Sequence, residues 1–155
     1  MTTLHRLSRL TLASSAATVL ACSNYDTGPS GNGTISASID GASWTGATTV
    51  QASYIASVFL VGGLDSQGRQ IVITIPGVAA AGTFSLSSGQ PAFAVVNFGA
   101  QTWSTTLTGG TGSATISTWS GSHAIGTFSF TAPANAGSGA TGTKVITSGT
   151  FDVRY

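Results

Sequence analysis

The most reactive side chain in this sequence belongs to its single cysteine, Cys22. Basic residues lie within positions 5–9, an apolar run follows over 10–20, and Ala21 directly precedes the cysteine. A basic start, an apolar stretch of about 7–15 residues and small residues at the cut define a secretory signal peptide. The run is also too short for a transmembrane helix, which needs about 20 residues. We therefore expect a signal peptide over 1–21, cut between Ala21 and Cys22.

The four residues that end this segment suggest a covalent modification of the cysteine. Val19-Leu20-Ala21-Cys22 resembles a lipobox, the tetrapeptide cut just before a cysteine that carries lipid. The resemblance implies a diacylglyceryl thioether and often an N-acyl chain on Cys22, and two or more chains give a stable membrane anchor. The alternative is an exported protein with an unmodified thiol, which would leave that thiol without a disulfide partner. Ser23 follows, with no Asp that would favour inner-membrane retention, so we expect the outer membrane in a diderm organism.

Histidine and aspartate are the other residues that could support catalysis or metal binding. His123 is the only histidine after residue 21, and a Ser-His-Asp triad could combine it with Asp40 or Asp152. No G-x-S-x-G motif selects a nucleophile among the many serines. Zinc needs three or four close ligands and calcium needs several carboxylates, whereas the chain has no glutamate and four isolated aspartates. We therefore expect no enzyme activity, no metal and no cofactor.

Three tryptophans are candidates for the core or for binding. Trp44 and Trp103 have the spacing of core residues. Trp119 has the opposite parity to Ala114 and Ile116, so it lies either on the outer face of its strand or beside a bulge. An exposed tryptophan could stack on a sugar ring or anchor a protein interface. Trp119 is therefore the candidate ligand-binding residue.

Charge is scarce once residues 1–21 are removed. The whole chain has a formal net charge of +1. Beyond residue 21, Arg69, Lys144 and Arg154 face four aspartates, which leaves −1. A basic footprint for nucleic acid is absent from this composition, so we expect no nucleic-acid partner. The polar surface must come from Ser, Thr, Gly, Asn and Gln, and the length indicates one domain.

Alternation of apolar and polar residues predicts strands along the rest of the chain. Ile35, Ala37 and Ile39 face one way and the polar residues between them face the other, as in a half-buried strand. Further strands are expected over 50–61 (one bent strand or two short ones), 71–75, 92–98, 102–107, 112–118, 124–131 and 143–155. Many short strands between Gly-rich turns predict an all-β fold, an antiparallel β-sandwich of Ig-like or jelly-roll-like type over 34–155. The lipidated cysteine and a flexible tether would occupy 22–33.

A Gly-Thr-Phe motif occurs three times, at 82–84, 126–128 and 149–151. Its unequal spacing excludes a solenoid or propeller. We interpret it as a strand entry, where glycine permits a bulge or a close approach and the aromatic residue points into the core.

Ile39-Asp40-Gly41 with Trp44, and the segments 126–132 and 146–155, resemble the opening and the ending of a family of small bacterial lipoproteins. The resemblance spans about residues 35–155. It implies a β-sandwich without an assigned biochemical activity, so it transfers no catalytic residues.

These observations favour a lipid-anchored envelope protein that serves as a structural or interaction module. It would bind the membrane through its N-terminal lipid and meet a protein or glycan partner in the envelope. One alternative is a carbohydrate- or peptidoglycan-binding module that uses Trp119. A hydrolase is a further alternative, and it requires a serine within hydrogen-bond reach of His123.

Overall fold

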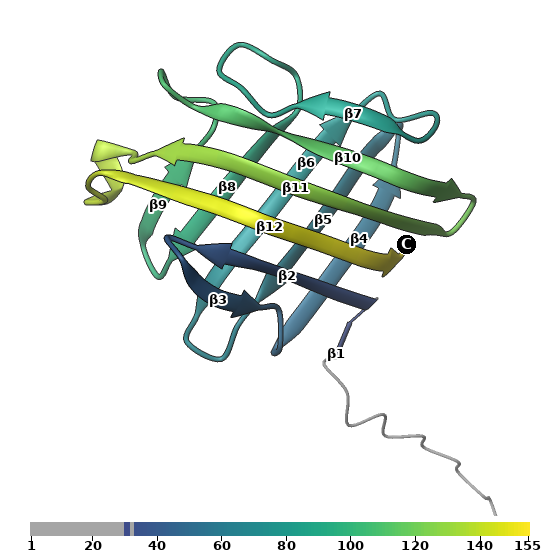
Figure 1. Cartoon of the computed structure of the whole chain (residues 1–155), viewed down its shortest axis with the longest axis horizontal. Coiled ribbons are helices and arrows are strands. Elements are labelled where there is room, and N and C mark those ends of the chain that lie inside the picture. Colours follow the sequence, from purple (N-terminus) through teal and green to yellow (C-terminus); the bar gives the residue numbers. More distant parts are fainter. Residues whose placement is uncertain (1–29, 32) are drawn as a thin grey trace, which may run out of the picture.

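The chain folds into two six-stranded β-sheets that pack face to face (Figure 1). The computed structural model describes residues 30–31 and 33–155. Sheet A contains, in spatial order, β1 (Ser30–Gly31), β4 (Thr49–Ile55), β5 (Val58–Leu64), β6 (Arg69–Pro76), β8 (Phe93–Phe98) and β9 (Gln101–Ser104). Sheet B contains β3 (Ala42–Thr45), β2 (Gly33–Ile39), β12 (Thr143–Arg154), β11 (His123–Pro133), β10 (Thr111–Ser120) and β7 (Gly82–Ser85).

The prediction of an all-β sandwich is confirmed. Within the described residues the only helical element is a short 3-10 turn, Ala136–Ser138. No helix in this part of the chain is long and apolar enough to cross a membrane. The segment 50–61 forms two strands, because Ala56 and Ser57 adopt positive φ values of 51° and 65° and turn the chain between β4 and β5. Strand pairing begins at Ser30, a few residues before position 34, while the remainder of the expected tether lies outside the described residues.

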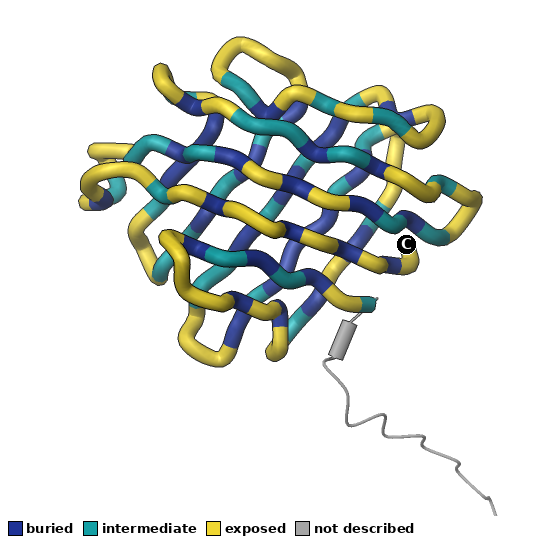
Figure 2. The backbone as a smooth tube through the Cα atoms, in the orientation of Figure 1, coloured by how far each residue is buried: buried dark blue, intermediate teal, exposed yellow. Residues whose placement is uncertain are grey.

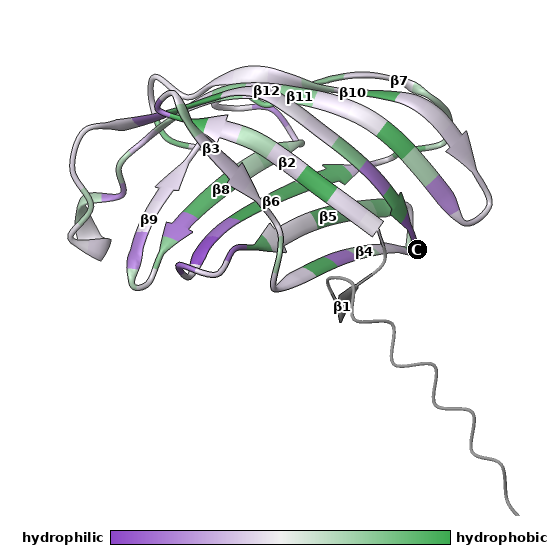
Figure 3. Cartoon of the chain, turned by 60° about the horizontal axis from the view of Figure 1, so that its bottom comes forward, coloured by the Kyte–Doolittle hydropathy of each residue, from purple (hydrophilic) through white to green (hydrophobic). Residues whose placement is uncertain are grey.

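Both sheets are built mainly from sequential hairpins. All strand pairs are antiparallel except the two-residue pairing of β1 with β4. The last strand, β12, lies between β2 and β11, so the two ends of the folded domain pair with each other at the centre of sheet B. The strands of the two sheets cross obliquely, which places β4, next to the two-residue edge strand β1, beneath one end of the sheet B strands (Figures 1 and 3).

The core lies between the sheets and contains the inward-facing residues of both. Figure 2 shows buried and exposed residues alternating along the strands of sheet B, as a pattern of period two requires. Trp44 and Trp103 are buried, at 2% and 4% exposure, as their spacing predicted. Their indole N–H groups donate to the carbonyls of Arg69 and Thr141 at 3.0 and 3.1 Å. Both rings therefore enter the core without leaving a polar atom unsatisfied.

The repeated Gly-Thr-Phe motifs come together in sheet B. Gly126 pairs with Phe151 and Phe128 pairs with Gly149 across β11 and β12. A Cβ on either glycine would overlap the phenylalanine ring opposite it. The interpretation of the motif as a strand entry is right for Gly82, which begins β7, and wrong for the other two glycines, which lie inside long strands. Their role is the close approach that glycine allows.

The outer faces of the two sheets differ in chemistry. One row of residues across all six strands of sheet B carries only hydroxyl side chains, and it consists of Thr83, Thr115, Thr127, Thr150, Ser36 and Thr45. Two neighbouring pairs in this row hydrogen-bond through their hydroxyl groups, Thr83 with Thr115 at 2.9 Å and Ser36 with Thr150 at 3.0 Å. The outer face of sheet A instead carries half-buried apolar side chains, at Leu60, Leu64, Val72, Phe93 and Val95.

Candidate functional site

Four aromatic side chains meet at one edge of the sandwich, and we call them the aromatic corner: Trp119, Tyr155, Tyr54 and Phe59. The Trp119 ring stacks on the Tyr155 ring with centroids 4.9 Å apart and planes 24° apart. Tyr54 and Phe59 from sheet A meet Trp119 edge-on, at 5.1 and 5.3 Å. Aromatic pairs in such geometries stabilise a structure beyond the area that they bury. The corner closes this edge of the sandwich.

A β-bulge turns Trp119 toward this corner. The pairing of β10 with β11 shifts between Ile116 and Thr118, so Ser117 is an extra residue in β10. Because side chains alternate with a period of two, one extra residue exchanges the faces of all later positions. Of the two placements that the sequence left open for Trp119, the structure shows the one beside a bulge. Tyr54 and Tyr155, its partners, were missed because parity identifies the face of a strand but not which residues of other strands lie beside it.

The polar ends of both tyrosines are bound within the protein. The Tyr54 hydroxyl donates to the Val78 carbonyl at 2.7 Å, and the Tyr155 hydroxyl donates to the Ser120 carbonyl. Burial raises the pKa of Tyr155, and the neighbouring Tyr54 adds to this effect. The corner therefore presents ring edges and aliphatic groups, and it offers no nucleophile or general base.

His123 lies in the row next to Trp119 on sheet B, on the outer face. Its Nε2 is 2.7 Å from Oδ1 of Asp152, a residue of β12 whose side chain is 59% exposed. Of the two aspartates considered for a triad, the structure brings Asp152 to the histidine, whereas Asp40 binds Lys144 at 2.8 Å. Among the described residues no serine hydroxyl bonds the His123 ring, and Ser120 Oγ reaches only its backbone carbonyl, at 3.4 Å.

Three pairs account for the charged side chains of the described residues other than Arg154: Arg69 with Asp65, His123 with Asp152, and Lys144 with Asp40. Asp65 accepts hydrogen bonds from the backbone N–H groups of Gln67 and Arg69 and from Arg69 Nε, at 2.9, 2.8 and 2.6 Å. Burial alone would raise the pKa of the Asp65 carboxyl, but these bonds outweigh it and hold that pKa below its ordinary value. Asp65 thus closes the turn before β6. No group of three or more potential metal ligands occurs in the described ranges.

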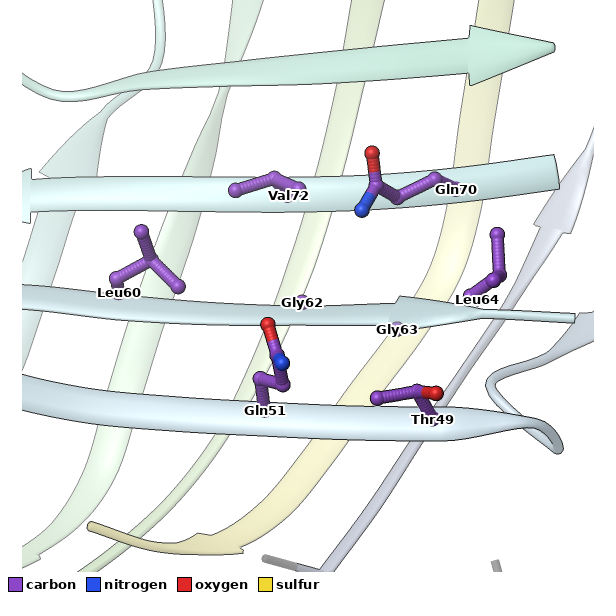
Figure 4. A pocket seen from close by; sticks show the side chains of 8 residues that line it. All are labelled: Thr49, Gln51, Leu60, Gly62, Gly63, Leu64, Gln70 and Val72. Carbon is purple, nitrogen blue, oxygen red and sulfur yellow. The ribbon is translucent and has the colours of Figure 1, made fainter. Parts of the chain in front are cut away.

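A shallow groove crosses the outer face of sheet A (Figure 4). Gly62 of β5 forms its floor, Gln51 of β4 extends along one side, and Gln70 and Val72 of β6 form the other. Gln70 Oε1 accepts a hydrogen bond from Asn97 Nδ2 at 3.0 Å, which leaves its N–H groups for a ligand. The lining contains no titratable side chain, so it can bind an uncharged molecule but has no group for acid–base chemistry.

The predicted lipidation site, Cys22, and its neighbour Ala21 lie outside the described residues, so the structure does not bear on them. Comparison with known proteins adds a family. A family model described as "Domain of unknown function (DUF6252)" matches residues 31–153, almost the whole of the sandwich. No curated protein and no solved structure matches the chain significantly.

Proposed function

We propose that this chain, which belongs to the DUF6252 family of domains of unknown function, is a lipid-anchored lipoprotein of the cell envelope. In this proposal the β-sandwich is a structural or interaction module held at the membrane by lipid on Cys22. The observation that carries the proposal is the sequence Val19-Leu20-Ala21-Cys22 at the end of a basic and then apolar segment.

Several features of the sandwich support a module without a catalytic step. The His123 ring has Asp152 as its partner, and within the described residues it has no serine hydroxyl to activate. The groove of sheet A has an uncharged lining. Every buried side-chain polar atom of the described part has a hydrogen-bond partner, so no buried polar group there is held ready for a substrate.

The test is metabolic labelling of the expressed full chain with an alkyne fatty acid. We expect label on the wild-type protein, none on Cys22→Ser, and recovery of the wild type in the membrane fraction. Ala21→Ser is a matched control, since it keeps a small residue at the cut and should retain the label. Equal labelling of the wild type and Cys22→Ser would contradict the proposal, as would an unmodified thiol on an exported chain.

A second candidate function is the binding of carbohydrate or peptidoglycan, favoured by the sheet A groove. Amide groups at Gln51 and Gln70 could bond sugar hydroxyls, while Leu60 and Val72 offer apolar contact to the faces of sugar rings. Trp119 is less suited to stacking on a sugar, because the Tyr155 ring already covers one of its faces.

A peptidoglycan pull-down of the mature protein separates these sites. If the groove binds glycan, Gln51→Ala should reduce retention, and Thr127→Ala, a matched change on the outer face of sheet B, should not. Loss of retention in Trp119→Phe alone would move the site to the aromatic corner. Absence of retention for the wild type would eliminate this function.

A further inference from the structure

We propose that the aromatic corner rests on the bilayer that holds the chain's own lipid, with Ile55 and Trp119 at the membrane interface. This inference rests on the proposed function, because it requires an anchor at Cys22. It assigns a membrane-facing edge to the sandwich and so determines which surfaces remain free for partners.

The chain enters the sandwich through β1, where Ser30 pairs with Thr49 at the other end of β4 from Ile55, and it then continues into β2 at the edge that carries the corner. Gly33, the first residue of β2, pairs with Val153, which pairs with Ala124, which pairs with Trp119. Trp119 is therefore three strand spacings from Gly33, about 14 Å at about 4.8 Å per spacing. Figures 1 and 3 both place the C-terminal end of β12 at this edge, close to β4.

The length of chain between the anchor and the domain keeps this edge near the membrane. Cys22 and Ser30, the first residue of β1, are eight positions apart, and a flexible chain of that length has an r.m.s. span of about 16 Å. A domain of about 120 residues has a radius of gyration of about 14 Å, and hence a diameter of about 35 Å. Because the tether is shorter than the domain is wide, the edge where it attaches stays closer to the lipid than the opposite edge.

Exposed apolar surface is concentrated at the same edge. Three large hydrophobic side chains are exposed in the described part of the chain, and two of them are neighbours here: Tyr54 at 37% and Ile55 at 73%. Ile55 precedes the turn Ala56-Ser57, so the tip of the β4–β5 hairpin carries no charge. Tyr54 is also in edge contact with Trp119, at 5.1 Å.

The mixture of groups fits a membrane interface better than a hydrocarbon core or bulk water. Trp and Tyr are enriched at the headgroup level because their rings are apolar and their N–H or O–H groups are polar. Arg154, the last residue of β12, is an exposed cation. It pairs with His123, one position from the row that contains Trp119, and there it can bind lipid phosphate. Ile55 at the tip of the β4–β5 hairpin, the aromatic corner and the exposed cation Arg154 thus occur together on the edge where the tether attaches.

Fluorescence of the lipidated full-length product in vesicles tests this arrangement. The protein is reconstituted with lipids brominated on their acyl chains, which quench only tryptophans in contact with the bilayer. Trp44 and Trp103 are buried in the core and supply an unquenched background. We expect quenching in the wild type that disappears in Trp119→Phe, a change that preserves an aromatic ring at the corner.

Two matched serine variants identify the contact surface. Ile55→Ser should reduce the quenching of Trp119, whereas Val145→Ser should not, because Val145 is 42% exposed but lies near the opposite end of β12. Mass spectrometry of the same sample reports acylation of Cys22. An acylated protein whose Trp119 is not quenched overturns this inference and leaves the proposed function intact. An unacylated Cys22 overturns both.

Discussion

Phe151 lies directly across from Gly126 on neighbouring strands, and its ring occupies the space that a side chain at position 126 would need. The relationship is reciprocal, since Phe128 occupies the space over Gly149 two residues further along the same pair of strands. Thr127 and Thr150, the central residues of the two motifs, face each other on the outer surface. Two copies of a three-residue motif therefore form one interlocked unit in which each glycine accommodates the other copy's aromatic ring.

This interlock makes a methyl group at position 126 costly. We expect Gly126→Ala to destabilise the domain by about 1–3 kcal/mol, as overpacking of a filled core does, because the new Cβ would overlap Phe151 and the Thr115 carbonyl. Urea unfolding followed by tryptophan fluorescence measures this change. Gly121→Ala is the control, since a Cβ at that turn position meets nothing within 4 Å. Equal stability of the two variants would show that the rings move aside freely.

The bulge at Ser117 determines which way Trp119 points. Deletion of Ser117 should restore regular pairing and leave Trp119 facing the corner, because Trp119 would then follow the inward-facing Ile116 by two positions and remain opposite Ala124. We expect an unchanged tryptophan emission, since the contacts of Trp119 with Phe59 and Tyr155 are kept. Ser117→Ala keeps the residue count and loses only the hydroxyl bond to the Ile125 carbonyl. A red-shifted emission after the deletion would contradict this account of the bulge.

Asp65 should make stability depend on pH on the acid side. Its carboxyl pKa is lower in the folded protein than the unfolded value of about 3.9. Its contribution is therefore present above that value and is lost as the pH falls through the folded pKa. We expect Asp65→Asn to cost about 1–3 kcal/mol at pH 7, the usual range for hydrogen bonds to a charged group. The gap between the urea midpoints of wild type and variant should narrow as the pH falls below about 3.9, and a gap that stays constant on acidification would refute this role.

The pair formed by His123 and Asp152 should contribute little to folding. Exposed ion pairs are worth about 0–1 kcal/mol, and the Asp152 side chain is 59% exposed. We expect His123→Ala and Asp152→Ala each to change the free energy of unfolding by less than about 1 kcal/mol. A double-mutant cycle measures their coupling directly, and a coupling well above this range would mark the pair as a specific structural or functional element.

Single strands and their faces followed from the sequence because each depends on neighbours along the chain. Ile35, Ala37 and Ile39 alternate with polar residues, and all three are buried. Trp44 and Trp103 have core spacing and are core residues. The Gly-rich turns expected between strands are also present, and Gly68 and Gly77 there adopt the positive φ values that glycine tolerates best. Strand faces and turns depend on residues that are close together in the sequence, so the sequence alone is enough to predict them.

Relations between distant strands required the tertiary structure. The sequence contained three Gly-Thr-Phe motifs and a tryptophan of unexpected parity, yet it did not show that two motifs interlock or that Trp119 meets Tyr54 across the sandwich. It also did not show that Asp152, and not Asp40, lies beside His123. The sequence by itself determined the strand-rich class, the low charge and the candidate anchor, since composition and period-two alternation are properties of short segments. Only the tertiary structure decided register, bulge and sheet crossing, because these depend on contacts between residues that are distant along the chain.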